Sequence, residues 1–367
     1  MAFFLFFFII ILLFLSFLNN SIVYVYKGQG HVGHSLLLGI IIFFTYIISL
    51  SNQNLFQSDT IAYFYNLQSL QSLVHSNSLL DIFNQVEFEK GFILLQIALG
   101  AITGNAQTYS LIMYSIIILL PIIATVYYFG FESMPFIMLQ YMFFNVFNTI
   151  SLIVLRQGIA IGILLISLMT YLKGHKKVSI LLMLISAQFH STAYIMFVSL
   201  LVIEFFKINL KWLLTIWGIG SLLYVTGWNQ RVVQYLPFNS KYISNYTGSL
   251  WSGQSELYGQ APNAIKYLLF SIVFLIIILF FKKMFLNNDI GMIFLSKVYV
   301  VWNTIFLIFG FVAFSSRIAL YSWMLFPLII FYAFWSNKVL KGYYPVLLVV
   351  WLIAGLVSLP IFGWKAI

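Results

Sequence analysis

The chain has 367 residues, of which 62% are hydrophobic, 19% are aromatic and only 7% are charged. Soluble globular chains are close to half apolar and about a quarter charged, and one soluble core cannot grow enough to bury this much apolar surface. The composition therefore excludes a soluble enzyme, a coiled coil, a disulfide scaffold and a disordered tail, and it predicts a polytopic membrane protein. The chain has no cysteine, which excludes thiolate catalysis, cysteine-ligated zinc and iron–sulfur clusters.

The formal net charge of +10 comes from 18 Lys and Arg against 8 Asp and Glu. In a membrane protein this excess reports orientation, because cytoplasmic loops collect Lys and Arg. No basic run is longer than the KGHKK of residues 173–177, so we expect no nucleic-acid partner. The apolar residues 1–18 lack the basic region and the cleavage site of a signal peptide, and we interpret them as a retained membrane helix.

A spanning helix needs about 20 apolar residues. The apolar runs cover residues 2–18, 35–50, 91–103, 108–129, 135–155, 157–172, 178–189, 191–206, 212–226, 264–281, 298–314, 318–335 and 343–359. They predict an all-α, polytopic integral membrane protein, a single membrane domain over residues 1–367 with about 11–13 membrane helices, short or re-entrant ones included.

Two polar stretches interrupt the apolar runs. Residues 51–90 are expected to form an extramembrane loop with an amphipathic helix, and residues 227–263 a large periplasmic loop. The aromatic residues of these loops suit contact with sugars or lipid headgroups, and an interfacial aromatic belt fits them as well. No internal repeat is visible, so a transporter built from inverted repeats has no support.

Residues 178–206 form either one overlong helix or two short helices with a break near His190. The two-helix interpretation places ten lysines on one side, the cytoplasmic side: Lys173, Lys176, Lys177, Lys207, Lys211, Lys282, Lys283, Lys297, Lys338 and Lys341. One long helix would move seven of them across the membrane. We therefore predict a helical hairpin, which puts His190, Arg156 and Arg317 at outer helix ends.

Residues 91–103 are too short for a full crossing, since they span about 20 Å at 1.5 Å per residue against a hydrocarbon core of about 30 Å. As a full crossing they put Asp59 on the inner side, and as a re-entrant element on the outer side. The basic residues do not decide, because Lys27 on one side balances Lys90 on the other. We favour the re-entrant interpretation because of the length.

Two arginines lie where apolar runs meet, Arg156 in ISLIVLRQGIAIG and Arg317 in VAFSSRIALYSW. An arginine this close to hydrocarbon is costly unless it is paired or faces a wet cavity. A guanidinium group suits bidentate capture of phosphate, and the alternative is a snorkelling headgroup anchor. Arg231, in the polar loop, fits the anchor role better.

Two further side chains could move protons. His190 in SAQFHSTAYI is either a general base or a structural residue at a helix break. In SDTIAYFYN, Ser58 or Asp59 caps a helix with Tyr63 on the next turn, or Asp59 accepts a proton from a hydroxyl group. There is no DxD motif, so a metal-dependent site for a nucleotide sugar lacks its usual ligands, and Glu87–x–Glu89 is a weak substitute. We expect neither a metal nor a cofactor.

Five segments occur in an order that resembles the EpsG family of Wzy-type O-antigen and capsule polysaccharide polymerases. They are DTIAYFYN from Asp59, EKGF from Glu89, RQGIAIGILL from Arg156, QFHSTAYI around His190 and RIALY from Arg317. The similarity runs from about residue 58 to residue 321. Lys90 stands where family members often have a proline.

The resemblance implies an all-helical enzyme, similar to C-type glycosyltransferases, at the outer face of the bacterial inner membrane. It would join repeat units linked to undecaprenyl pyrophosphate. Arg156 and Arg317 would bind the pyrophosphate, and Asp59 and His190 are candidates for activating the acceptor hydroxyl. The substrate would also contact Tyr63, Glu89 and Gln157.

The partners implied are the undecaprenyl-pyrophosphate-linked oligosaccharide, membrane lipid, a Wzz-type chain-length regulator and a Wzx-type flippase. Two other functions compete with the polymerase. A flippase or transporter of lipid-linked sugars would need intramembrane acids and internal symmetry, but few acids lie within the apolar runs and no symmetry is apparent. A membrane O-acetyltransferase would need an arginine cluster upstream of a helical histidine, and the sequence has no such cluster.

Overall fold

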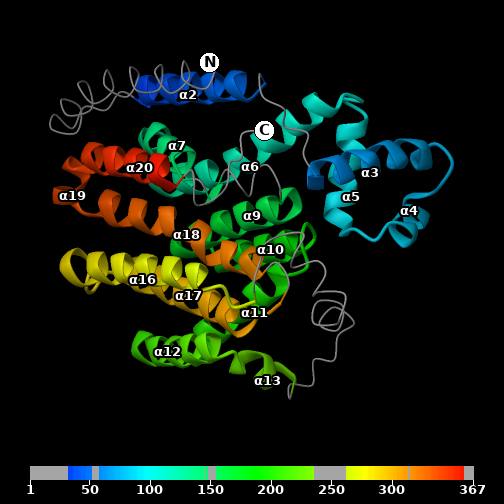
Figure 1. Cartoon of the computed structure of the whole chain (residues 1–367). Coiled ribbons are helices and arrows are strands. Elements are labelled where there is room, and N and C mark those ends of the chain that lie inside the picture. The colour runs from blue at the N-terminus through cyan, green and yellow to red at the C-terminus, as the bar shows by residue number, and fades with distance from the viewer. Residues whose placement is uncertain are drawn as a thin grey trace. The chain divides into compact units, whose positions relative to one another are not determined.

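The computed structural model describes residues 32–51, 58–144, 146–147, 154–234, 262–312 and 315–358, and every regular element within them is helical (Figure 1). Within these residues, five helices are long and apolar enough to cross a membrane: α6 (Ala106–Phe129), α9 (Leu155–Leu172), α16 (Ile265–Phe285), α17 (Ile290–Ile308) and α18 (Ser315–Ser336). The protein is therefore an all-α, polytopic membrane protein. The helix expected at residues 2–18 lies outside the described residues.

Further helices connect and flank these five. They are α2 (Val32–Ser51), α3 (Ser58–Val74), α4 (Leu79–Gln85), α5 (Lys90–Gly100), the 3₁₀ helix η1 (Phe131–Ser133), α7 (Met134–Met142), α10 (Lys176–Ala187), α11 (Ala193–Phe206), α12 (Leu210–Thr226), α13 (Trp228–Gln234), α19 (Lys338–Gly342) and α20 (Tyr344–Ser358). With its 20 residues, α2 coincides with the apolar run at 35–50, whereas α3 and α4 lie in the polar stretch at 51–90.

The chain divides into two compact units, Met1–Tyr194 with Phe334–Ile367, and Ile195–Ala333. In the first unit α9 packs between α6 and α10. The approach to α6 is close, because a Cβ atom on Gly162 would lie 2.5 Å from Leu120 Cβ. The approach to α10 is fixed by hydrogen bonds from Ser186 Oγ to Ala160 O and from Ser167 Oγ to Ser179 O, both 2.8 Å long. These contacts make α9 the buried centre of the unit and set the place of its first residues.

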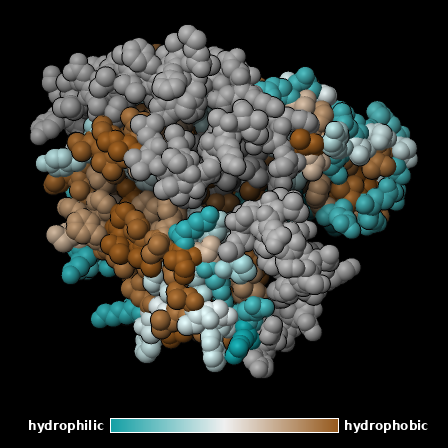
Figure 2. Space-filling model, in the orientation of Figure 1, coloured by the Kyte–Doolittle hydropathy of each residue, from teal (hydrophilic) through white to brown (hydrophobic). Residues whose placement is uncertain are grey.

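In the second unit α17 packs against α12 and α16. The outer face of α16 carries an apolar stripe at helical spacing, and hydrophobic side chains gather over this helix in Figure 2. The exposed members of the stripe are Ile265, Leu269, Val273, Ile276, Phe280 and Met284. An exposed stripe of this length suits contact with lipid chains.

The predicted break near His190 is confirmed, because α10 ends at Ala187 and α11 begins at Ala193. Backbone hydrogen bonds from His190 N to Ser186 O and from Ala193 N to His190 O shape the turn between them. The predicted short element at residues 91–103 is also present, since α5 has 11 residues and therefore extends for about 16 Å.

Two predicted boundaries are wrong. Residues 135–155 do not form one spanning helix, because α7 ends at Met142 and α9 begins at Leu155. All residues from Pro135 to Met142 are buried in protein, so their apolarity reflects packing and not a crossing. Lys297, expected at a helix end, lies inside α17, because Asp289 caps that helix earlier by accepting a hydrogen bond from Met292 N at 2.7 Å.

Candidate functional site

An ion pair joins Glu89 and Arg156 across 67 residues of sequence. Arg156 is the second residue of α9, and its Nη1 atom lies 2.6 Å from Glu89 Oε2. Glu89 precedes α5 directly, but its side chain makes no hydrogen bond to cap that helix. The two side chains are 22% and 18% exposed. The pair therefore lies at the start of a spanning helix, partly buried and still open to a ligand.

Three aromatic rings lie against the guanidinium group of Arg156. Its Cζ atom is 4.5 Å from the ring centroid of Phe88, 5.5 Å from that of Tyr63 and 5.9 Å from that of Phe92. The rings also contact one another edge to face, with centroids 5.4 to 5.9 Å apart. Cation–π attraction and mutual packing hold the guanidinium group over this aromatic floor, formed by Tyr63, Phe88 and Phe92.

The floor is fixed by contacts between α3 and α5. Gln96 in α5 is fully buried, and its Nε2 atom donates hydrogen bonds to Tyr63 O at 3.1 Å and to Tyr109 Oη at 3.0 Å. The Tyr63 hydroxyl in turn accepts a hydrogen bond from Arg156 Nε at 3.4 Å. Gln96 thus fixes the backbone of Tyr63 to α5, and the side chain of Tyr63 binds Arg156.

The turn between α10 and α11 closes the other side of the pair. Ser191 N donates a hydrogen bond to Glu89 Oε1 at 2.9 Å, and Phe92 N donates one to Gln188 O at 3.2 Å. Gly91 allows this approach, because a Cβ atom there would lie 2.7 Å from Gln188 O. A glycine is required at position 91 for backbone to meet backbone.

His190 lies in the same turn. Its Nδ1 atom is 2.6 Å from Thr192 Oγ1. Burial raises the pKa of the Glu89 carboxyl, but the Arg156 guanidinium and the Ser191 N–H group outweigh burial and leave this pKa below its ordinary value. The carboxylate of Glu89 is therefore ionised at neutral pH.

The structure brings Tyr63, Glu89, Arg156 and His190 together, four of the residues that the sequence identifies as site candidates. Gln157 follows Arg156 but is only 1% exposed. The side chain of Asp59 lies outside the described residues, although Asp59 belongs to α3, one turn before Tyr63.

Arg317 belongs to the second unit, where it is the third residue of α18. The roles expected for Asp59, Gln157 and Arg317 stay predictions. Sequence reasoning missed the floor residues Phe88 and Phe92. Phe88 directly precedes the EKGF segment and Phe92 ends it. This spacing of four residues, one helical turn, could have indicated that both rings lie on the same side near Glu89.

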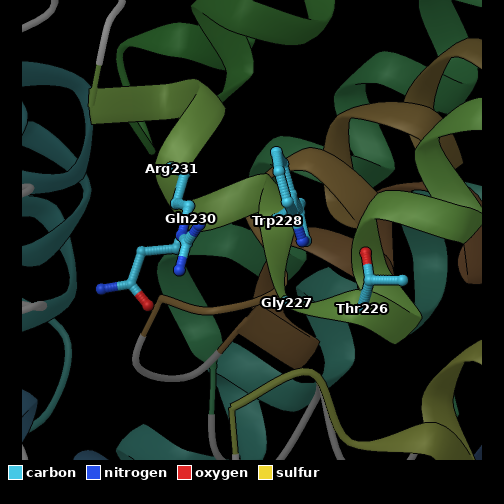
Figure 3. Close-up of a pocket in the computed structure, with 5 residues that line it drawn as sticks. All are labelled: Thr226, Gly227, Trp228, Gln230 and Arg231. Atoms are coloured by element: carbon cyan, nitrogen blue, oxygen red, sulfur yellow. The ribbon is translucent and has the colours of Figure 1, made fainter.

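A second polar feature lies at the corner between α12 and α13 (Figure 3), a hollow of about 400 Å³. Its lining residues are Thr226, Gly227, Trp228, Gln230 and Arg231. The Arg231 guanidinium lies 5.1 Å from the Trp228 ring centroid, and both side chains are exposed. Arg231 thus belongs to the short helix α13 and not to an irregular loop, and its anchor role stays a prediction.

Within the described ranges no group of three or more His, Cys, Asp or Glu side chains could hold a metal ion. The fold and the charged pair at the start of a spanning helix define a multi-pass membrane protein with a polar site at a helix end. The chain belongs to the EpsG family, whose model matches residues 35–365, a range that contains the five segments named above. No curated protein and no solved structure matches the chain. Family membership makes it a membrane protein of polysaccharide synthesis.

Proposed function

We propose that the protein is a polysaccharide polymerase of the Wzy type. It transfers a growing glycan from undecaprenyl pyrophosphate to a lipid-linked repeat unit at the outer face of the bacterial inner membrane. The observation that carries the proposal is the Glu89–Arg156 pair, which joins an acid, a guanidinium group and the His190 turn from distant parts of the sequence. Membership of the EpsG family supports the same reaction class.

The chemistry of such a transfer suits these residue types. A pyrophosphate that leaves an anomeric carbon gains negative charge in the transition state, and a fixed guanidinium group stabilises charge where it develops. The incoming sugar hydroxyl must lose a proton to a group within hydrogen-bond reach. In the proposal Arg156 and Arg317 bind the pyrophosphate, and Asp59 or His190 accepts the proton.

The substrates and partner proteins of this reaction lie in the same membrane. The donor and the acceptor carry isoprenoid tails, and a protein with exposed apolar stripes such as that of α16 can hold them within the bilayer. A Wzx-type flippase would supply the lipid-linked unit, and a Wzz-type regulator would set the chain length.

Deletion of the gene, followed by analysis of lipid-linked and surface glycans, tests the proposal. We expect carriers that hold a single repeat unit and no long polymer. Absence of every lipid-linked unit from the outer face would indicate a flippase, and full-length chains without acetyl groups would indicate an O-acetyltransferase. Complementation with the wild-type gene should restore long polymer, and complementation with Arg156→Ala should not.

A further inference from the structure

The structure assigns Glu89 a positioning role: its carboxylate orients the Arg156 guanidinium so that one end of it faces an incoming phosphate group. The inference rests on the proposed function, because it concerns how the same site holds a polyprenyl pyrophosphate. It differs from the sequence-based expectation that Glu89 contacts the substrate itself.

The pattern of donors carries the inference. Arg156 donates a hydrogen bond from Nη1 to Glu89 Oε2 and another from Nε to the Tyr63 hydroxyl. Among the described residues no hydrogen bond or ion pair engages Nη2. A guanidinium group has five N–H donors in a fixed plane, so two anchored nitrogens determine where the third one points. The aromatic floor blocks movement of this plane toward α3 and α5.

The carboxylate of Glu89 is poorly placed for the other roles of an acid. Both oxygens are engaged, Oε2 by Arg156 and Oε1 by the Ser191 N–H group. A general base must take up a proton, and protonation here would break the ion pair. A pyrophosphate carries the same sign of charge as the carboxylate, so direct contact with it would be repulsive. Glu89 therefore acts on an anionic ligand through Arg156.

A competing arrangement would use the same contacts in the opposite sense. If Glu89 occupied the position that the phosphate must take, it would be an internal competitor, and its removal would strengthen binding. If it positions Arg156, its removal weakens binding. Glu89→Gln distinguishes the two, because the amide keeps the size of the side chain and loses the charge.

The experiment measures binding of farnesyl pyrophosphate to the full-length protein in lipid nanodiscs, with empty nanodiscs as the blank. We expect Glu89→Gln to weaken binding about tenfold, within the coupling energies usual for contacting residues. Glu89→Asp keeps the charge and should recover part of this loss. Glu87→Gln, which alters an exposed carboxylate two residues away, is the matched control and should leave affinity unchanged.

A double-mutant cycle isolates the action through Arg156. In an Arg156→Ala background, Glu89→Gln should change the residual affinity by less than twofold, because there is no guanidinium group left to orient. An equal loss in both backgrounds, or tighter binding by Glu89→Gln alone, would overturn the inference. Absence of saturable binding by the wild-type protein would instead contradict the proposed function. Thermal unfolding of each variant in the same nanodiscs identifies any loss that comes from misfolding.

Discussion

Arg156 shows at the scale of a single residue how a charge is held near hydrocarbon. Its side chain meets one carboxylate, one hydroxyl and three rings. Arg156→Lys should therefore lower polymer to near the level of Arg156→Ala, because an ammonium group cannot reproduce the planar fork that reaches Glu89 and Tyr63 together. Polymer length on gels, normalised to the amount of protein in the membrane, is the measurement. Arg231→Lys is the matched control, since Arg231 is exposed and lies in the other unit.

Asp59 and His190 are the two candidates for the group that accepts the proton of the sugar hydroxyl. Asp59→Asn should lower the rate of polymerisation by roughly 10²–10⁴-fold, the usual contribution of a general base. His190→Gln should be milder, because Nδ1 of His190 already lies 2.6 Å from Thr192 Oγ1, which suits an orienting role. The rates are measured in membrane vesicles supplied with lipid-linked repeat units. Normal polymer from Asp59→Asn together with none from His190→Gln would reverse the two roles.

The sequence identified most of the polar members of the site but not their arrangement. Arg156 and His190 were visible because charged residues are rare within apolar runs. Their partnership with Glu89 was not visible, since residues 89 and 156 are 67 positions apart and only packing of α5 against the α10–α11 turn brings them together. The rings of Phe88 and Phe92 were hidden among the 39 phenylalanines of the chain.

At the scale of helices, the contact between α5 and the α10–α11 turn depends on the absence of a side chain at position 91. Gly91→Ala would place a Cβ atom 2.7 Å from Gln188 O, so the two elements must separate. We expect less polymer and a lower melting temperature, measured on the purified protein. Gly104→Ala is the control, because a Cβ atom there would meet nothing within 4 Å.

A buried polar network joins helices of the second unit. Asn303 in α17 accepts a hydrogen bond from Trp217 Nε1 at 2.8 Å, and it donates to Ser271 Oγ at 2.9 Å and to Ser322 Oγ at 3.0 Å. Trp323 Nε1 donates to the same Ser271 hydroxyl. Within a bilayer such hydrogen bonds stabilise helix packing, because the alternative is an unpaired polar group in hydrocarbon.

Asn303→Leu removes the three interhelical hydrogen bonds of this side chain. Each such bond in a membrane contributes about 0.6 kcal/mol on average, so the free energy of unfolding should fall by about 1–2 kcal/mol. Unfolding of the purified protein by denaturant in mixed micelles measures the change. Ser221→Ala is the control, because the Ser221 hydroxyl donates its hydrogen bond to Trp217 O in its own helix. Equal effects of the two substitutions would contradict a special role of Asn303 between helices.

Hydropathy predicted where helices occur and failed where apolar residues serve packing instead of lipid contact. The ends of α6, α9 and α16 lie within a few residues of the predicted runs. The run at 135–155 misled because a helix buried in protein and a helix buried in lipid have the same composition. The start of α17 was missed because Ser296 and Lys297 interrupt the apolar sequence inside the helix, and the signal for the true start was the capping Asp289.

At the scale of the whole molecule, the orientation of the membrane helices follows from the lysines and from the break at His190. The break separates α10, with 12 residues, from α11, with 14. The lysine distribution predicts a hairpin here, with the lysines at 173–177 and at 207–211 on one side of the membrane. The opposite side then carries the turn of His190 and, after α12, residues 227–263. We therefore expect residues 173–177, 282–283 and 338–341 to be cytoplasmic and residues 227–263 to be periplasmic.

The absence of cysteine makes this orientation directly measurable, because a single introduced cysteine is the only thiol in the protein. Ser249→Cys should react with a membrane-impermeant maleimide in spheroplasts, whereas Lys176→Cys should react only after lysis. The reason is that Lys176, the first residue of α10, belongs to the basic cluster at 173–177, and basic clusters remain on the cytoplasmic side. Labelling of Ser249→Cys only after lysis would place the His190 turn on the inner side. Such a result would separate His190 from a lipid-linked sugar that is polymerised on the outer face, and it would contradict the proposed site together with the orientation.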